Sequence, residues 1–122
     1  MAVLSCPSGS YTVEISGGIP DYAFYNCDAL TSVTIPDSVT SIGNGPFAAC
    51  SSLREILVSS GNKNFASESG VLFSIDFRTL KQFPAGSSIT SYRVPDSVTS
   101  IGAYAFWLCS SLSSVTIGEN VT

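Results

Sequence analysis

The sequence contains no histidine, and its 4 cysteines include no closely spaced pair. A serine or cysteine nucleophile is usually activated by a neighbouring base, most often a histidine. A zinc site usually needs histidines, or cysteine pairs about two to four residues apart. We therefore expect neither an enzyme nor a metal site.

Charged residues are also scarce, at 11% of the chain against roughly 25% in an average soluble domain. The 5 basic residues are scattered, and the net charge is −4. Nucleic-acid binding needs clustered Lys and Arg, so we expect none. The glycine-rich fingerprint of a nucleotide-binding loop is missing too, because Gly43 to Gly45 runs directly into Pro46. We expect no cofactor.

Long apolar runs are absent as well, although 44% of the residues are hydrophobic. No run approaches the ~18 residues of a membrane-spanning helix, so we expect no membrane insertion. The first ten residues lack the basic region and the long apolar core of a signal peptide, and we expect no signal peptide in this chain.

What the sequence does contain is a repeat. A phenylalanine, a cysteine, a leucine and two aliphatic residues recur with spacings of 3, 3, 3 and 2. Copies start at Phe24, Phe47 and Phe106, and the first two start 23 residues apart. This period is typical of a solenoid coil, which cannot bury its apolar residues alone and relies on stacking with its neighbours.

A fourth unit lies in the longer interval between Val58 and Val94, with Phe83 at its start and Gly86 in place of the cysteine. The additional residues include two alternating runs, 70–74 and 79–83, around a short turn. These runs predict a β-hairpin that projects from the stack, and the polar segment 61–69 predicts a loop. We expect the repeated phenylalanines to form one continuous column: Phe24, Phe47, Phe83 and Phe106.

Local patterns predict the structure of each unit. The β-branched segments 33–35, 56–58 and 115–117 predict strands. Val39 and Ile42 predict a second extended leg that faces the core, and the apolar spacing around Phe47 predicts a short helical or 3₁₀ turn. We predict one solenoid domain, 1–122, built mostly of short parallel strands, with coils at about 11–35, 36–58, 59–94 and 95–122.

These residues resemble a known family. The unit LTSVTIPDSVTSIG followed by FxxCSSL is similar to the BspA-type leucine-rich repeat of bacterial and protozoan surface proteins, and GVLFSIDFRTLKQFPAG resembles its hairpin variant. The resemblance covers roughly Ile19 to Val121. It implies a right-handed solenoid with a parallel sheet on one face, an extracellular location at the cell surface, and a role in adhesion or host binding.

Three cysteines, Cys27, Cys50 and Cys109, share one repeat position. We expect a column of buried free thiols, which pack as small hydrophobic groups. A disulfide between Cys27 and Cys50 is the alternative, since stacked strands lie ~5 Å apart. It is disfavoured because side chains at one repeat position run parallel to each other.

Two surfaces are candidates for binding. Residues that flank the buried pair in each strand face outward and form what we call the strand strip, the usual binding face of a solenoid. The strip comprises Ser32, Thr34, Glu55, Leu57, Ser91, Arg93, Ser114 and Thr116. The second candidate, the aromatic patch, comprises Tyr22, Tyr25, Tyr104 and Trp107, because Tyr and Trp favour contact surfaces. The alternatives are a merely solvated strip and aromatic side chains that only cover the core.

Two functions follow. The chain is either an adhesion or recognition module that binds a protein or glycan on another cell or matrix, or a structural spacer within a longer stalk. Neither end carries a polar capping unit, and open solenoid ends need protection. We therefore also expect end-to-end self-association.

Overall fold

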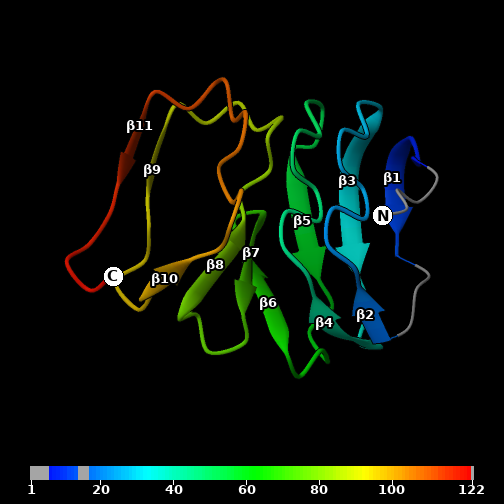
Figure 1. Cartoon of the computed structure of the whole chain (residues 1–122), viewed down its shortest axis with the longest axis horizontal. Helices are drawn as coiled ribbons and strands as arrows, with labels where there is room; N and C mark the ends of the chain where they lie inside the picture. The colour runs from blue at the N-terminus through cyan, green and yellow to red at the C-terminus, as the bar shows by residue number, and fades with distance from the viewer. Residues whose placement is uncertain (1–5, 14–16, 122) are drawn as a thin grey trace.

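The computed structural model describes residues 6–13 and 17–121 and shows a β-solenoid of about five turns, so the predicted fold class is confirmed. Figure 1 shows the coils side by side, with β1 at one end and β9 and β11 at the other. No helix occurs within the described residues. The strands are β1 (Gly9–Thr12), β2 (Gly17–Ile19), β3 (Leu30–Ile35), β4 (Val39–Ile42), β5 (Glu55–Val58), β6 (Phe65–Glu68), β7 (Val71–Ser74), β8 (Thr79–Gln82), β9 (Ser91–Arg93), β10 (Ser100–Ile101) and β11 (Ser114–Thr116).

The repeat period sets the register of the parallel strands. Strands β1, β3 and β5 form one sheet in which Val33 lies opposite both Tyr11 and Ile56. Val33 and Ile56 are completely buried, because strand side chains alternate and these positions face the inside of the coil. The predicted second leg is also present: β2 pairs with β4, and Val39 and Ile42 are both buried.

Between the legs and the sheet, the chain makes consecutive turns, so the helical or 3₁₀ turns that we expected are only a minor feature. In the first coil, the amides of Ala23, Tyr25 and Cys27 each donate to the carbonyl three residues earlier. Tyr22 and Asn26 have φ angles of 56° and 62°, which break any 3₁₀ helix. The amides between these turns bond to the next coil instead, as Phe24 N–H does to the carbonyl of Pro46 at 2.8 Å.

The inserted segment lies within the stack and does not project from it. β7 and β8 pair antiparallel, which confirms the predicted hairpin, but β6 pairs with β7 as well. The prediction of a loop at 61–69 was therefore wrong in part. Phe65 is buried and begins β6, a strand that the polar composition of this segment did not indicate. β8 also pairs with β10, so it serves as the second leg of its coil.

Strand β7 is buried on both faces and divides the core. Leu72 packs with the first two coils, whereas Val71 and Phe73 pack with the last two. The expected continuous phenylalanine column is accordingly two stacked pairs. The rings of Phe24 and Phe47 are 5.4 Å apart, and those of Phe83 and Phe106 are also 5.4 Å apart.

Gln82 joins the two halves of the core. Its side chain is completely buried. The Oε1 atom accepts the amide of Phe47 at 3.4 Å, and Nε2 donates to the carbonyl of Ala105 at 3.2 Å. In the first coil, the equivalent amide of Phe24 bonds to a backbone carbonyl, that of Pro46. A side chain thus replaces the backbone link between coils where the insertion interrupts the repeat.

The cysteines do not form one column of free thiols. Cys27 forms a disulfide with Cys6, with a Cα–Cα distance of 5.1 Å. The prediction for Cys27 was therefore wrong, because the N-terminal segment, outside the repeat, brings Cys6 to it. Cys50 is a buried free thiol and Cys109 a half-buried one. In the third coil, Gly86 lies so close to the second coil that a Cβ would clash with the backbone of Ser52 and Leu53, which explains the missing cysteine.

Candidate binding site

The strand strip is exposed or half-exposed throughout, but the structure divides it into two groups. Ser32 lies opposite Glu55, and Thr34 lies opposite Leu57 on β3 and β5. The other four residues lie on the separate β9–β11 pair, with Ser114 opposite Ser91 and Thr116 opposite Arg93.

The insertion causes this division. The amide of Ile56 in β5 donates to the carbonyl of Gly70 at 2.8 Å, and the amide of Val58 donates to the hydroxyl of Ser67 at 2.9 Å. Strand β6 and the turn that follows it therefore occupy the free edge of β5, and β9 lies in a separate sheet. The strip is not one continuous row.

Strand β1 extends the first group, which the sequence interpretation did not include. Ser10 lies opposite Ser32, and Thr12 lies opposite Thr34. The hydroxyl of Ser32 donates to that of Ser10 at 3.0 Å. The alternation of Tyr11 and Val13 with polar neighbours was the signal that could have revealed this extension.

In the second group, Arg93 contacts Asp96 of its own coil, with 3.1 Å between Nη2 and Oδ1. Both side chains are largely exposed, at 69% and 78%. Exposed pairs of this kind contribute at most about 1 kcal/mol. The guanidinium therefore gains little from this pair and can exchange Asp96 for another acceptor.

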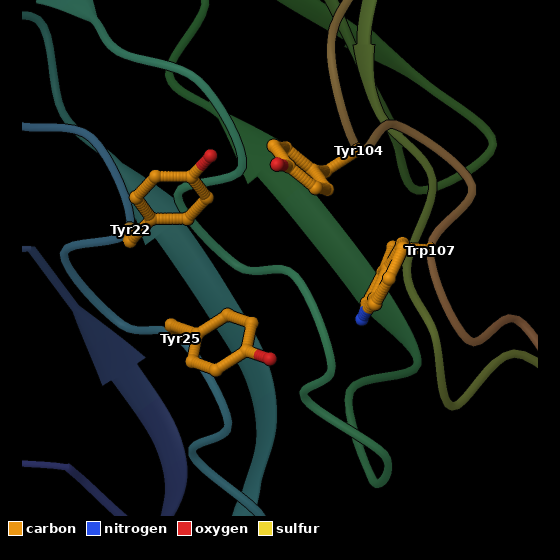
Figure 2. A pocket seen from close by; sticks show the side chains of 4 residues that line it. All are labelled: Tyr22, Tyr25, Tyr104 and Trp107. Carbon is orange, nitrogen blue, oxygen red and sulfur yellow. The ribbon is translucent and has the colours of Figure 1, made fainter.

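The aromatic patch encloses a hollow of about 330 Å³, lined by Tyr22, Tyr25, Tyr104 and Trp107. Figure 2 shows the four side chains arranged around it. Two come from the turn of the first coil and two from that of the last. Tyr25, Tyr104 and Trp107 are 38%, 42% and 44% exposed, so they cover the core only in part.

Small residues in the second coil allow these distant turns to meet. Gly45 occupies the repeat position of Tyr22 and Tyr104, and Ala48 occupies that of Tyr25 and Trp107. A Cβ on Gly45 would be 3.0 Å from the ring of Tyr22 and 3.3 Å from the Cβ of Tyr104. Gly45 also has a φ of 55°, which favours glycine.

The rings contact one another edge to face. The centroids of Tyr22 and Tyr104 are 5.2 Å apart at an interplanar angle of 68°, and those of Tyr104 and Trp107 are 5.4 Å apart at 76°. Such pairs are favourable aromatic geometries. A hydrogen bond with Tyr104 raises the pKa of Tyr22 from 10.0 to about 12, which favours the neutral form of its hydroxyl.

Metal-ligating side chains and free thiols are the remaining groups of the described residues that could carry chemistry. No group of three or more His, Cys, Asp and Glu residues is placed to hold a metal ion in that part of the chain. Burial raises the pKa of Cys50 and of Cys109 to about 11, which leaves both free thiols protonated and weakly nucleophilic. Across residues 6–13 and 17–121, no helix is long and apolar enough to cross a membrane.

Stacked parallel strands, a repeated Phe–Cys–Leu pattern and an integrated hairpin define a leucine-rich-repeat solenoid. Residues 17–122 match the model of the BspA type leucine rich repeat region, in 6 copies, and the chain belongs to this family. No curated protein is a significant match to the chain.

Three solved structures are similar. A leucine-rich repeat protein from Eubacterium ventriosum matches with a TM-score of 0.89 and 32% identity over 93% of this chain and 31% of its own. The pneumococcal vaccine antigen PcpA matches with a TM-score of 0.72 and 34% identity, over 75% of this chain and 23% of its own. A leucine rich cell surface protein from Faecalibacterium prausnitzii shares the fold, with a TM-score of 0.70. Its identity is 21% over 93% of this chain and 36% of its own. The chain spans about a third or less of these proteins.

Proposed function

We propose that the chain is a non-enzymatic recognition module of an extracellular surface protein and mediates adhesion by binding a protein or a glycan. The resemblance to the BspA-type repeats of surface proteins, and one structural neighbour that is described as a cell surface protein, support this location. The solenoid presents a rigid surface, and its chemistry suits contact rather than catalysis.

The aromatic hollow is the observation that carries the proposal. Tyr and Trp side chains bury a large area with few rotatable bonds, which makes them frequent contact residues. Here, four of them converge from turns about 80 residues apart in sequence, and three remain more than a third exposed. A solvated or purely structural surface does not need this arrangement.

The test is binding of the purified chain to arrays of glycans and matrix proteins, with variants of each surface. Tyr25→Leu alters the hollow, whereas Leu57→Ala and Arg93→Ala alter the two groups of the strand strip. Loss of about tenfold in affinity for any of these variants identifies the contact surface. If the wild-type chain binds nothing on either array, the recognition role is wrong.

The alternative, a spacer within a longer stalk, is favoured by the division of the strand strip, because a broken strip offers less continuous contact area. It predicts no ligand and tolerance of all three substitutions. The same arrays therefore separate the two functions.

We also propose self-association through the last described coil, where Leu108 and Ile117 are 63% and 52% exposed. Exposed apolar clusters commonly mark protein contacts. Light scattering should show a mass that rises with concentration and is reduced by Ile117→Ser. A monomer at millimolar concentration would contradict this.

A further inference from the structure

The hollow is lined by apolar ring surfaces, and its polar groups are three tyrosine hydroxyls and one indole N–H, none of them charged. All four lining side chains are aromatic. Figure 2 shows the hydroxyl of Tyr25 and the indole nitrogen of Trp107 turned toward each other across the opening, and the hydroxyls of Tyr22 and Tyr104 together on the opposite side. A ligand would therefore meet ring surfaces and neutral polar atoms at the rim.

Charge and size narrow the class of ligand. None of the residues that line the hollow is positively charged, and the chain carries a net charge of −4. Both features disfavour phosphate groups and nucleic acids as ligands. The Trp and Tyr ring faces also attract cations, whereas the Tyr25 hydroxyl and the indole N–H at the rim favour a neutral partner that carries hydroxyl groups. The volume of about 330 Å³ is at the lower end of ligand pockets, which span roughly 300–1,000 Å³.

A neutral pyranose has the complementary features, since its C–H faces are apolar and its rim carries hydroxyl donors and acceptors. We propose, as an extension of the recognition function above, that the hollow binds one neutral pyranose residue of a glycan. The sugar packs against the rings of Tyr25 and Trp107, and its hydroxyls bond to the polar atoms at the rim.

The repeat itself supports an open site at this place. The position after the repeated phenylalanine is Tyr25 in the first coil and Trp107 in the last, but Ala48 and Pro84 in the two coils between them. Aromatic residues at these two positions would continue the row and fill the space. The small residues keep the hollow open, although covering the core would favour large ones.

The protein carries its own reporter, because Trp107 is its only tryptophan. Trp107 fluorescence is titrated with methyl β-glucopyranoside, methyl β-galactopyranoside and N-acetylglucosamine, and with sorbitol as an acyclic control of similar polarity. We expect a saturable change with at least one pyranose and none with sorbitol. An equal response to sorbitol would overturn the proposal.

Variants separate stacking from hydrogen bonding. Tyr25→Leu removes the ring and should weaken binding about tenfold or more, whereas Tyr25→Phe keeps the ring and should cost less. Circular dichroism tests whether each variant is folded. Trp107→Leu, measured by ligand-observed NMR, gives a second loss of ring surface if Tyr25→Leu fails to fold.

A glycan array and a matrix-protein array complete the test, with wild type, Tyr25→Leu and the strand-strip variant Arg93→Ala. Glycan binding that Tyr25→Leu removes and Arg93→Ala retains supports the pyranose site. Glycan binding that only Arg93→Ala removes, or binding to proteins alone, overturns the site but leaves the recognition function intact. No binding on either array overturns both.

Discussion

The buried side chain of Gln82 offers the sharpest test of how the two halves of the solenoid are held together. Replacement by methionine keeps the length and most of the volume but removes the amide group. The carbonyl of Ala105 keeps a partner, because it also accepts the amide of Phe83 at 2.8 Å. The amide of Phe47, by contrast, loses the acceptor at Oε1.

A buried donor left without a partner costs about 1–3 kcal/mol. Gln82→Met should therefore lower the free energy of unfolding by about 2 kcal/mol. The loss falls at the junction between the two core clusters, and repeat proteins behave as coils coupled to their neighbours. We expect the variant to unfold less cooperatively, with a lower slope of unfolding free energy against urea.

Urea denaturation followed by circular dichroism measures both quantities, and hydrogen exchange at the amide of Phe47 should accelerate. Lys63→Met is the control, since Lys63 is exposed and its replacement should change stability by less than about 0.5 kcal/mol. If Gln82→Met matches the control in stability and exchange, the amide group does not couple the two halves.

Three further predictions concern other parts of the chain. Asn62 is buried, donates to two backbone carbonyls and accepts hydrogen bonds from two backbone amides, one of them that of Phe65. Asn62→Ala should therefore lower the free energy of unfolding by about 2–4 kcal/mol, measured by urea denaturation. A decrease below about 1 kcal/mol would contradict this. Reducing the Cys6–Cys27 disulfide should lower the free energy of unfolding by about 3 kcal/mol, because it opens a loop with a sequence separation of 21. Thermal melts with and without reductant measure this, and the Cys6→Ser variant should be insensitive to reductant. The pKa of Tyr22 is raised from 10.0 to about 12, so the folded state favours its neutral form: this stabilisation is fully present below pH 10 and is lost as the pH rises through 12. Ultraviolet titration should show one late-ionising tyrosine fewer in Tyr22→Phe, and a loss of amplitude near pH 10 rather than near pH 12 would refute the hydroxyl bond.

The periodicity of the sequence predicted the inward and outward faces of the regular coils well. Val33 and Ile56 are buried and in register, as expected for residues one period apart. Such residues experience the same local environment in each coil, so their placement depends on spacing alone. The insertion broke this rule: the loop predicted at 61–69 was wrong in part, and the hairpin forms but does not project from the stack.

A strict repeat of apolar residues can be buried only when successive coils stack, so the repeat alone predicted the solenoid. The three-dimensional packing brings together residues that are not equivalent in the repeat: Cys6 with Cys27, Gln82 with Phe47, and the aromatic side chains of the first coil with those of the last. The first contact depends on the N-terminal segment, the second on how the insertion packs, and the third on small residues such as Gly45. None of them follows from the period, since each arises where the repeat is broken.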